Sequence, residues 1–251
     1  MFHSLENFNF DIYYSFCYKI YLIMDTLLKI EKLKFGYVKE RTVLDIKNLS
    51  IEKNKIYLLL GKNGSGKTTL LKILSGLIKV EDIEIDINDK KNSYIFKNNY
   101  TKKNFSLIKK TLKKMSIYVH QHPIMLTGNV FYNIAYPLKI IGTKKEDISN
   151  KVNSIMKRLS IDHLSDKNSR EISTGEAQKV AIARAVITNR EIVLLDEPIA
   201  NIDKDTLLNI EELLLDLKNS RTIILSSHNS FLNYRMCDYV ISLENGKNSL
   251  E

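Results

Sequence analysis

Short apolar runs alternate along the chain with longer segments in which apolar residues recur at helical spacing. Runs of aliphatic residues predict buried strands at residues 55–60, 116–119, 192–195 and 222–225. Helical spacing predicts helices at 67–78 and 204–217. The stretch 25–35 alternates between apolar and polar residues and predicts an edge strand. Strands and helices in this order indicate an α/β layer with a mainly parallel sheet.

Three further segments depart from this alternation. Residues from about 122 to 172 contain no comparable apolar run and predict a helical insertion in the α/β core. Residues 86–104 are rich in Asn and Lys and predict a mobile surface excursion. Residues 1–24 form an N-terminal extension that lacks an early basic cluster and a cleavage site, so it is a poor signal peptide. We expect Met24 to be the true start and 25–248 to be one domain; the alternative is an added amphipathic helix.

The composition fits a folded domain in a reducing compartment. The chain has 251 residues, of which 44% are apolar, and that fraction suffices for a packed core. The two cysteines, Cys17 and Cys237, lie far apart, so a disulfide-stapled secreted scaffold is not expected. No apolar run approaches the roughly 20 residues that span a bilayer. If a membrane is involved, we expect the chain to work beside it.

The net charge of +9 comes mostly from scattered lysines. The densest cluster comprises Lys102, Lys103, Lys109, Lys110, Lys113 and Lys114. No regular aromatic platform and no nucleic-acid-binding motif accompanies the cluster. We therefore expect a solvated surface and no nucleic-acid partner, with a nucleic-acid or lipid contact as the alternative.

A glycine-rich segment connects the strand predicted at 55–60 to the helix predicted at 67–78. It reads Gly61-Lys-Asn-Gly-Ser-Gly-Lys67-Thr68 and fits the pattern G-x-x-x-x-G-K-[ST]. The glycines let backbone N–H groups turn toward phosphate oxygens, and the helix start adds its positive dipole end. Lys67 would bring a full charge to the β- and γ-phosphates, and the Thr68 hydroxyl would bind Mg²⁺. This context indicates a P-loop rather than a chance glycine-rich turn.

Two adjacent carboxylates end the strand predicted at 192–195. Asp196 at the strand tip would hold Mg²⁺, and Glu197 would polarise the attacking water. A plain exit from strand to turn is the alternative, but unpaired buried carboxylates are costly.

At this point the chain resembles the ATP-binding cassette (ABC) family over nearly all of residues 25–248. The specific motif is Ile172-Ser-Thr-Gly-Glu-Ala-Gln178, which is similar to the family signature L-S-G-G-Q/E. A Ser and a Gly at a helix start, here predicted at about 176–188, offer a hydroxyl, N–H groups and a dipole to an anion. The resemblance implies that this anion is the γ-phosphate of ATP held by the opposite subunit. A simple capped core helix is the alternative.

The resemblance also assigns the other site residues. It places the signature contacts at Ser173, Thr174, Gly175 and Glu176. It places the ATP contacts of one subunit at Tyr37, Gly61, Lys62, Asn63, Gly64, Ser65, Gly66, Lys67, Thr68, Thr69 and Gln121. It makes Glu197 and His228 catalytic, Asp203 part of the D-loop, and Thr68, Gln121 and Asp196 the Mg²⁺ ligands. Tyr37 would stack on adenine, with Phe35 as its rival.

One residue of the signature departs from the family pattern, and a pair of histidines raises the separate question of a metal site. Thr174 replaces the usual second-position Gly of the signature, and we expect activity to be retained. His120 and His122 bracket Gln121, but no further Cys or His lies near in sequence, so a metal site there is not favoured.

The resemblance implies a fold, an activity and partners. The fold is a RecA-like core with a mainly parallel sheet, an antiparallel β subdomain and a helical insertion. The activity is Mg²⁺-dependent ATP hydrolysis in a dimer of two ATP-binding subunits, expected to be a homodimer. The partners are a separate membrane permease, contacted from the cytoplasmic face, and an extracytoplasmic solute-binding protein. The cassette is most similar to those for oxyanion uptake, tungstate or molybdate. Phosphate or amino-acid import and a soluble, non-transport ATPase are the alternatives.

Overall fold

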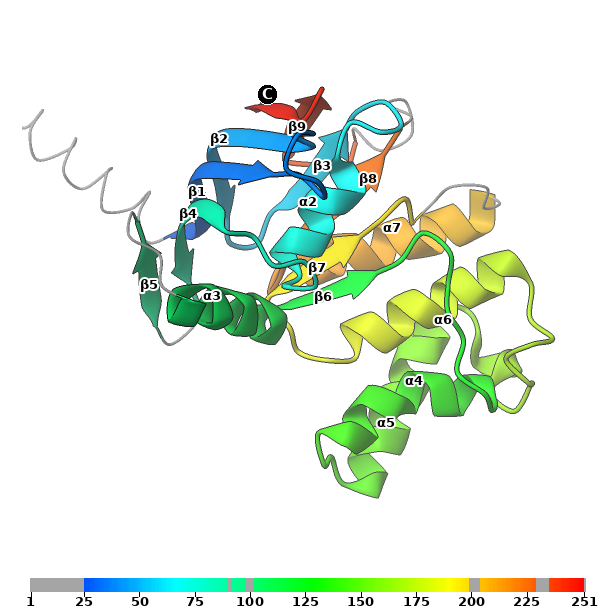
Figure 1. Cartoon of the computed structure of the whole chain (residues 1–251). Coiled ribbons are helices and arrows are strands. Elements are labelled where there is room, and N and C mark those ends of the chain that lie inside the picture. Colours follow the sequence, from blue (N-terminus) through cyan, green and yellow to red (C-terminus); the bar gives the residue numbers. More distant parts are fainter. Residues whose placement is uncertain (1–24, 90–91, 98–101, 199–203, 229–234, 251) are drawn as a thin grey trace, which may run out of the picture.

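Two β-sheets and a set of helices make up the described part of the chain. A computed structural model describes residues 25–89, 92–97, 102–198, 204–228 and 235–250 (Figure 1). The four-stranded antiparallel sheet has the order β2-β1-β4-β5, with β1 Thr26–Phe35, β2 Leu44–Glu52, β4 Asp82–Asn88 and β5 Ser93–Phe96. The six-stranded sheet has the order β10-β9-β3-β8-β7-β6. Its strands are β3 Ile56–Leu60, β6 Ser116–Val119, β7 Ile192–Leu195, β8 Thr222–Ser227, β9 Tyr239–Glu244 and β10 Lys247–Leu250.

Helices cover both faces of the six-stranded sheet, and further helices pack against these in turn. The helices are α2 Lys67–Leu74, α3 Lys102–Met115, α4 Val130–Ile140, α5 Lys145–Arg158, α6 Thr174–Val186, α7 Lys204–Lys218 and the short 3₁₀ turn η1 Asp162–Leu164. Helices α4 and α5 lie together with α6 on one side of the molecule, and the antiparallel sheet lies on the other (Figure 1). Among the described residues, no helix is both long and apolar enough to cross a bilayer.

The period of two along β3 divides its side chains between two hydrophobic cores. Ile56 and Leu58 belong to the core shared with α4, α5, α6 and α7. Tyr57 and Leu59 belong to the core shared with α2, α3 and the antiparallel sheet. Because both faces of the strand are covered, the sequence of β3 is a continuous apolar run rather than an alternating one.

Four neighbouring strands of this sheet run parallel and therefore end at the same edge. Strands β3, β8, β7 and β6 are paired in parallel register. The residues that follow them include Gly61 after β3, Gln121 after β6, Asp196 after β7 and His228 after β8. The topology thus collects side chains from four distant parts of the sequence at one edge, which is where ligands bind in such sheets.

The α/β class, the mainly parallel sheet and the antiparallel sheet are confirmed, but three details are wrong. Strand β1 is internal to its sheet rather than an edge strand, because it pairs with both β2 and β4. The segment 86–104 is more regular than expected, since it includes the end of β4, the whole of β5 and the start of α3. The phosphate-loop helix ends at Leu74 rather than at residue 78, because Gly76 turns the chain with a φ of 66°.

The lysine cluster belongs to α3, an amphipathic helix. Its Ile108, Leu112 and Met115 are buried against the second core. Lys110, Lys113 and Lys114 are exposed on the outer side. The apolar residues therefore hold the helix against the core. Lys113 and Lys114 lie in its last turn, where their positive charges interact favourably with the negative end of the helix dipole.

Candidate functional site

The loop between β3 and α2 can be formed only with glycine at two of its positions. Gly66 has a φ of 107°, and a β-carbon there would lie 2.6 Å from Leu44 Cδ2. A β-carbon on Gly61 would lie 2.4 Å from the carbonyl oxygen of Leu243. Glycine removes both conflicts and allows the left-handed conformation of Gly66. The loop therefore brings its backbone close to whatever occupies its concave side.

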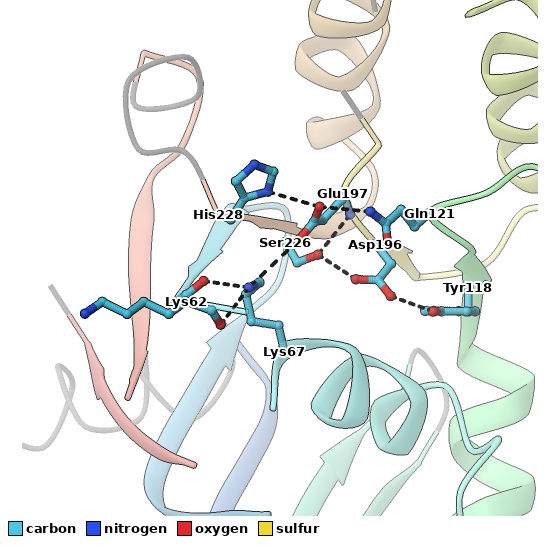
Figure 2. A network of polar contacts seen from close by, with 9 residues as sticks. Lys62, Lys67, Tyr118, Gln121, Asp196, Glu197, Ser226 and His228 are labelled. Carbon is cyan, nitrogen blue, oxygen red and sulfur yellow. Dashed lines mark hydrogen bonds and ion pairs between the residues drawn. The ribbon is translucent and has the colours of Figure 1, made fainter. Parts of the chain in front are cut away.

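Lys67, the first residue of α2, is buried beneath this loop at 5% exposure. Its Nζ donates to the carbonyl oxygens of Gly61 at 2.6 Å and Lys62 at 3.3 Å (Figure 2). Glu197 Oε1 lies 3.9 Å from the same nitrogen. Burial lowers the pKa of Lys67, and the charges of Glu197 and Asp196 oppose that effect. A positive charge is therefore held in a confined place beside two carboxylates.

A cavity of about 510 Å³ opens above Lys67. Its lining combines the phosphate loop with residues from the strand ends, and comprises Val43, Asn63, Gly64, Gly66, Lys67, Thr68, Thr69, Gln121, Glu197 and His228. The Ser65 hydroxyl oxygen, in the loop itself, is buried and has no hydrogen-bond partner among the described residues. A buried polar atom of this kind is costly unless a ligand satisfies it. The site thus offers unused polar capacity next to a cation.

Asp196 is 2% exposed, and both of its carboxylate oxygens accept hydrogen bonds. Ser226 Oγ donates to Oδ1 and Tyr118 Oη donates to Oδ2, each at 2.7 Å (Figure 2). Burial raises the pKa of Tyr118, and its hydrogen bond to Asp196 adds to that rise. The tyrosine is therefore the donor in this pair, and the two hydrogen bonds fix the orientation of the Asp196 side chain.

Glu197 lies at the meeting point of the polar groups in Figure 2. Its Oε2 is 3.1 Å from Gln121 Nε2 and 3.1 Å from His228 Nδ1. Its backbone N–H donates to Ser226 Oγ at 2.9 Å. Its φ is 45°, in the left-handed region that residues with a β-carbon rarely adopt. The turn after β7 is thus held in an unusual conformation that directs the carboxylate at the cavity.

The donor set at the strand ends suits a hard cation. Thr68 and Gln121 line the cavity. Asp196 precedes the cavity residue Glu197 in sequence, and both residues are hydrogen-bonded to Ser226 Oγ. Hydroxyl, amide and carboxylate oxygens are the ligands that Mg²⁺ prefers. Because both Asp196 oxygens are already hydrogen-bonded, this residue would act through the water shell of the ion.

Tyr37 and Phe35 lie at the margin of the site and differ in exposure. Tyr37 is 63% exposed, and its hydroxyl is 3.3 Å from Thr69 Oγ1. Phe35 packs edge-on against the Tyr37 ring and is partly buried against the second core. Tyr37 is thus the more exposed of the two rings, whereas Phe35 serves mainly as packing.

The start of α6 lies outside this cavity. Ser173 caps the helix by accepting from the Glu176 N–H at 3.3 Å, and Glu176 Oε2 accepts from the Ser173 N–H at 2.6 Å. The second of these bonds is the main reason why the pKa of Glu176 is lowered. None of Ser173, Thr174, Gly175 and Glu176 lines the cavity. The helix begins at Thr174 and ends at Val186, two residues earlier at each end than expected.

Two further positions named in the sequence analysis are the D-loop aspartate and the histidine pair. Asp203 falls outside the described residues. The rings of His120 and His122 are 6.1 Å apart, and within the described ranges no group of three metal-binding side chains is found.

Three residues that the sequence reading missed contribute to the site. Tyr118 and Ser226 hold Asp196, and Val43 lines the cavity. Ser226 could have been found, because it lies in the apolar run of β8 two residues before His228. No sequence signal distinguishes Tyr118 from an ordinary strand tyrosine.

Comparisons with known proteins show the family to which the chain is similar. The family model described as "ABC transporter" matches residues 44–200. The tungstate uptake system ATP-binding protein TupC of Peptoclostridium acidaminophilum is 38% identical over 208 residues, which cover 82% of this chain and 89% of that protein. The phosphate import ATP-binding protein PstB of Saccharolobus solfataricus is 34% identical over 218 residues, covering 84% and 82%. The methionine import ATP-binding protein MetN of Francisella tularensis subsp. holarctica is 32% identical over 226 residues, covering 88% and 62%.

A solved structure of an ABC transporter subunit has a similar fold. It is cbiO1 from Clostridium perfringens, described as part of the ABC transporter complex cbiONQ. It superposes with a TM-score of 0.75 at 26% identity, covering 90% of this chain and 87% of that one.

Proposed function

Since the chain belongs to the ABC transporter family, as an ATPase subunit of an importer, we propose that it energises uptake of an oxyanion such as tungstate or molybdate. In this proposal it binds a separate membrane permease at the cytoplasmic face of the membrane, and an extracytoplasmic protein delivers the solute. The observation that carries the ATPase chemistry is the convergence of Lys67, Gln121, Glu197 and His228 on one cavity.

The cavity residues divide the work of hydrolysis. The loop N–H groups, Ser65 and Lys67 bind and neutralise the phosphates, and Tyr37 stacks on the adenine. Glu197 orients the attacking water and accepts its proton as the water oxygen bonds to the γ-phosphorus and the bond to ADP breaks. Gln121 and His228, each 3.1 Å from Glu197 Oε2, hold that carboxylate in place.

Mg²⁺, when bound, supplies charge neutralisation at the β- and γ-phosphates. Thr68, Gln121 and Asp196 are the residues that would hold it. Ser226 and Tyr118 each donate a hydrogen bond to Asp196 and hold it in place, so that its position does not depend on the ligand.

The separation of the α6 start from the cavity supports a two-subunit site. Ser173 and Gly175 carry the signature motif but contribute nothing to the cavity of their own chain. We propose that they contact the γ-phosphate bound by a second copy, and that Asp203 lies near that interface. ATP then holds the two copies together, and hydrolysis releases them to move the permease.

Similarity to the tungstate protein TupC, over most of both chains, supports an oxyanion cargo. PstB and MetN, which are importers of phosphate and methionine by name, support the alternatives of phosphate and amino-acid uptake. The cassette itself does not contact the cargo, so its site cannot distinguish them.

The test of the ATPase assignment uses the purified chain and Glu197→Gln. The wild-type protein should hydrolyse ATP with Mg²⁺, and the variant should bind ATP, form a dimer and turn over roughly a hundredfold more slowly. Measurements are phosphate release and light scattering with and without ATP. Turnover of the variant near the wild-type rate would remove Glu197 from its role.

The test of the cargo uses the complex. The tagged chain should co-purify with a multi-span permease. Vesicles that contain both, with ATP enclosed on the cassette side and the solute-binding protein outside, should accumulate tungstate or molybdate. Uptake of phosphate or an amino acid instead would select an alternative cargo. Co-purification with ribosomes or DNA and no permease would favour a soluble role.

A further inference from the structure

A second cavity lies away from the ATP site, between α5, the end of α6 and the end of α7. Its volume is about 550 Å³, within the range of pockets that bind small molecules. The catalytic residues described above take no part in its lining. It therefore needs a separate explanation.

Three cationic side chains line this cavity: Lys151 and Arg158 from α5, and Arg221 from the turn before β8. No carboxylate is part of the lining. Arg158 forms an ion pair with Asp216, whose side chain is mostly exposed on α7. Lys151 forms no ion pair or hydrogen bond with any residue that the structure describes. The cavity therefore has a surplus of positive charge.

Arg221 has unused hydrogen-bonding capacity. One of its terminal nitrogens donates to the carbonyl oxygens of Val186 at 2.6 Å and Thr188 at 3.1 Å, which caps the end of α6. Its Nε is buried and has no partner in the described part of the chain. Its second terminal nitrogen, Nη2, forms no hydrogen bond with any described residue, and an anion in the cavity would be an acceptor for it.

The cavity also has an apolar floor, formed by Ile155, Val186 and Leu217. An inorganic anion would leave this floor in contact with water. A carboxylate carries a single charge, whereas a phosphate monoester carries close to two at neutral pH and matches several cations better. The lining thus favours a ligand in which an apolar group is joined to a phosphate.

We propose that this cavity is a second ligand site, which binds small organic phosphate esters through Lys151, Arg158 and Arg221. The site lies where α5 meets α7 and the end of α6, so a ligand there contacts both the helical side and the sheet side of the molecule. This inference does not depend on the proposed transport function.

The test is a titration of the full-length, methyl-labelled chain with 1-naphthyl phosphate, followed by NMR. The methyl signals of Ile155, Val186 and Leu217 should shift, and 1-naphthol, which lacks the phosphate, should leave them in place. Val43 lines the ATP cavity and serves as an internal reporter for phosphate binding there. Unmoved signals from the second cavity, or equal shifts with 1-naphthol, would overturn the proposal.

Substitutions of the charged residues test which side chains contact the phosphate group of the ligand. Lys151→Glu should weaken binding about tenfold or more, because one charge-assisted hydrogen bond accounts for about that factor. Arg158→Gln should weaken it as well. Lys157→Glu is the matched control, since Lys157 is exposed on the same helix but does not line the cavity. An equal loss in Lys157→Glu would mean that only the general charge of α5 matters and would refute the site. Binding of ATP, followed at Val43, reports on the proposed function separately.

Discussion

Two helix starts in this protein carry anion-binding motifs, and they differ in how their N–H groups are used. Helix α2 begins after Gly66, and no side chain caps it. Helix α6 begins after Ser173, and a capping box with Glu176 closes it. The first four N–H groups of a helix need partners from outside the helix. The start of α2 therefore has donors available for phosphate, whereas the start of α6 already uses its own side chains.

This difference suggests an order of two events at the ATP site, nucleotide binding first and engagement of the signature second. The phosphate loop, Lys67 and the carboxylates are assembled within one chain, so we expect nucleotide to bind without a second copy. At α6 the Ser173 hydroxyl is 3.3 Å from the Glu176 N–H, a long bond that a phosphate could replace. Engagement of the signature thus exchanges one set of contacts for another, and we expect it to follow nucleotide binding.

The largest expected effect comes from the α2 side. Lys67→Ala should lower ATP affinity and reduce turnover by at least about a hundredfold, because a buried cation facing the phosphates is lost. Isothermal titration and phosphate release would measure the two quantities. Lys72→Ala, in the last turn of the same helix and outside the cavity, is the matched control. Full activity of Lys67→Ala would contradict the placement of the phosphates.

Ser173→Phe should separate the two helix starts. It leaves the cavity of its own chain intact, so ATP should still bind, but the bulky ring should block the second copy and lower turnover by about tenfold or more. Binding is measured by titration, and dimer formation by light scattering. Ser220→Phe, exposed at the end of α7, controls for the added ring. A variant that hydrolyses ATP as fast as wild type would show that α6 does not complete the site.

Tyr118→Phe tests whether the acid beside α2 is held by its own chain. Removal of the hydroxyl leaves Asp196 with one donor instead of two, and we expect turnover to fall by about threefold to tenfold. The apparent affinity for Mg²⁺, measured through its effect on turnover, should weaken with it. Tyr136→Phe, on α4, is the control. An unchanged Mg²⁺ dependence would limit Tyr118 to packing.

The smallest effect is expected from Glu176→Gln. The lowered pKa of Glu176 means that its ionised form stabilises the fold above the ordinary pKa of a carboxyl group. This contribution should disappear as the pH falls through the lowered value, so wild type and variant should converge in acid. Urea unfolding at neutral and acidic pH would show the difference. Glu171→Gln, exposed just before the helix, should show no such convergence.

The six-stranded sheet, whose strands lead into the sequence motifs, is easier to predict from the sequence than the antiparallel sheet. Buried strands β3, β7 and β8 have continuous apolar runs because both of their faces are covered. Of the antiparallel strands, only β1 is predicted by its alternation; the antiparallel sheet itself is expected only through the family resemblance, although Asp82–Asn88 alternates along its whole length. Alternation of this kind predicts a half-buried strand, but it does not show how many neighbouring strands pair with it. The prediction that β1 is an edge strand is wrong for this reason.

The site was predictable where the backbone itself carries the function. Gly61, Gly66 and Lys67 occur at fixed spacing because a loop and a helix start position them. Tyr118 contacts Asp196 across 78 positions of sequence, and only the register between β6 and β7 brings the two together. Contacts of this kind follow from strand order, which a local pattern does not encode.

The left-handed backbone at Glu197 has a consequence for anyone who would make this protein more robust. A residue with a β-carbon at this φ costs the fold on the order of 1 kcal/mol, which glycine would not. A selection for heat resistance alone would thus reward Glu197→Gly, and it would discard the group to which we assign the activation of water. Thermal tolerance and catalytic power are therefore opposed at this one position, and any engineering campaign should score both together.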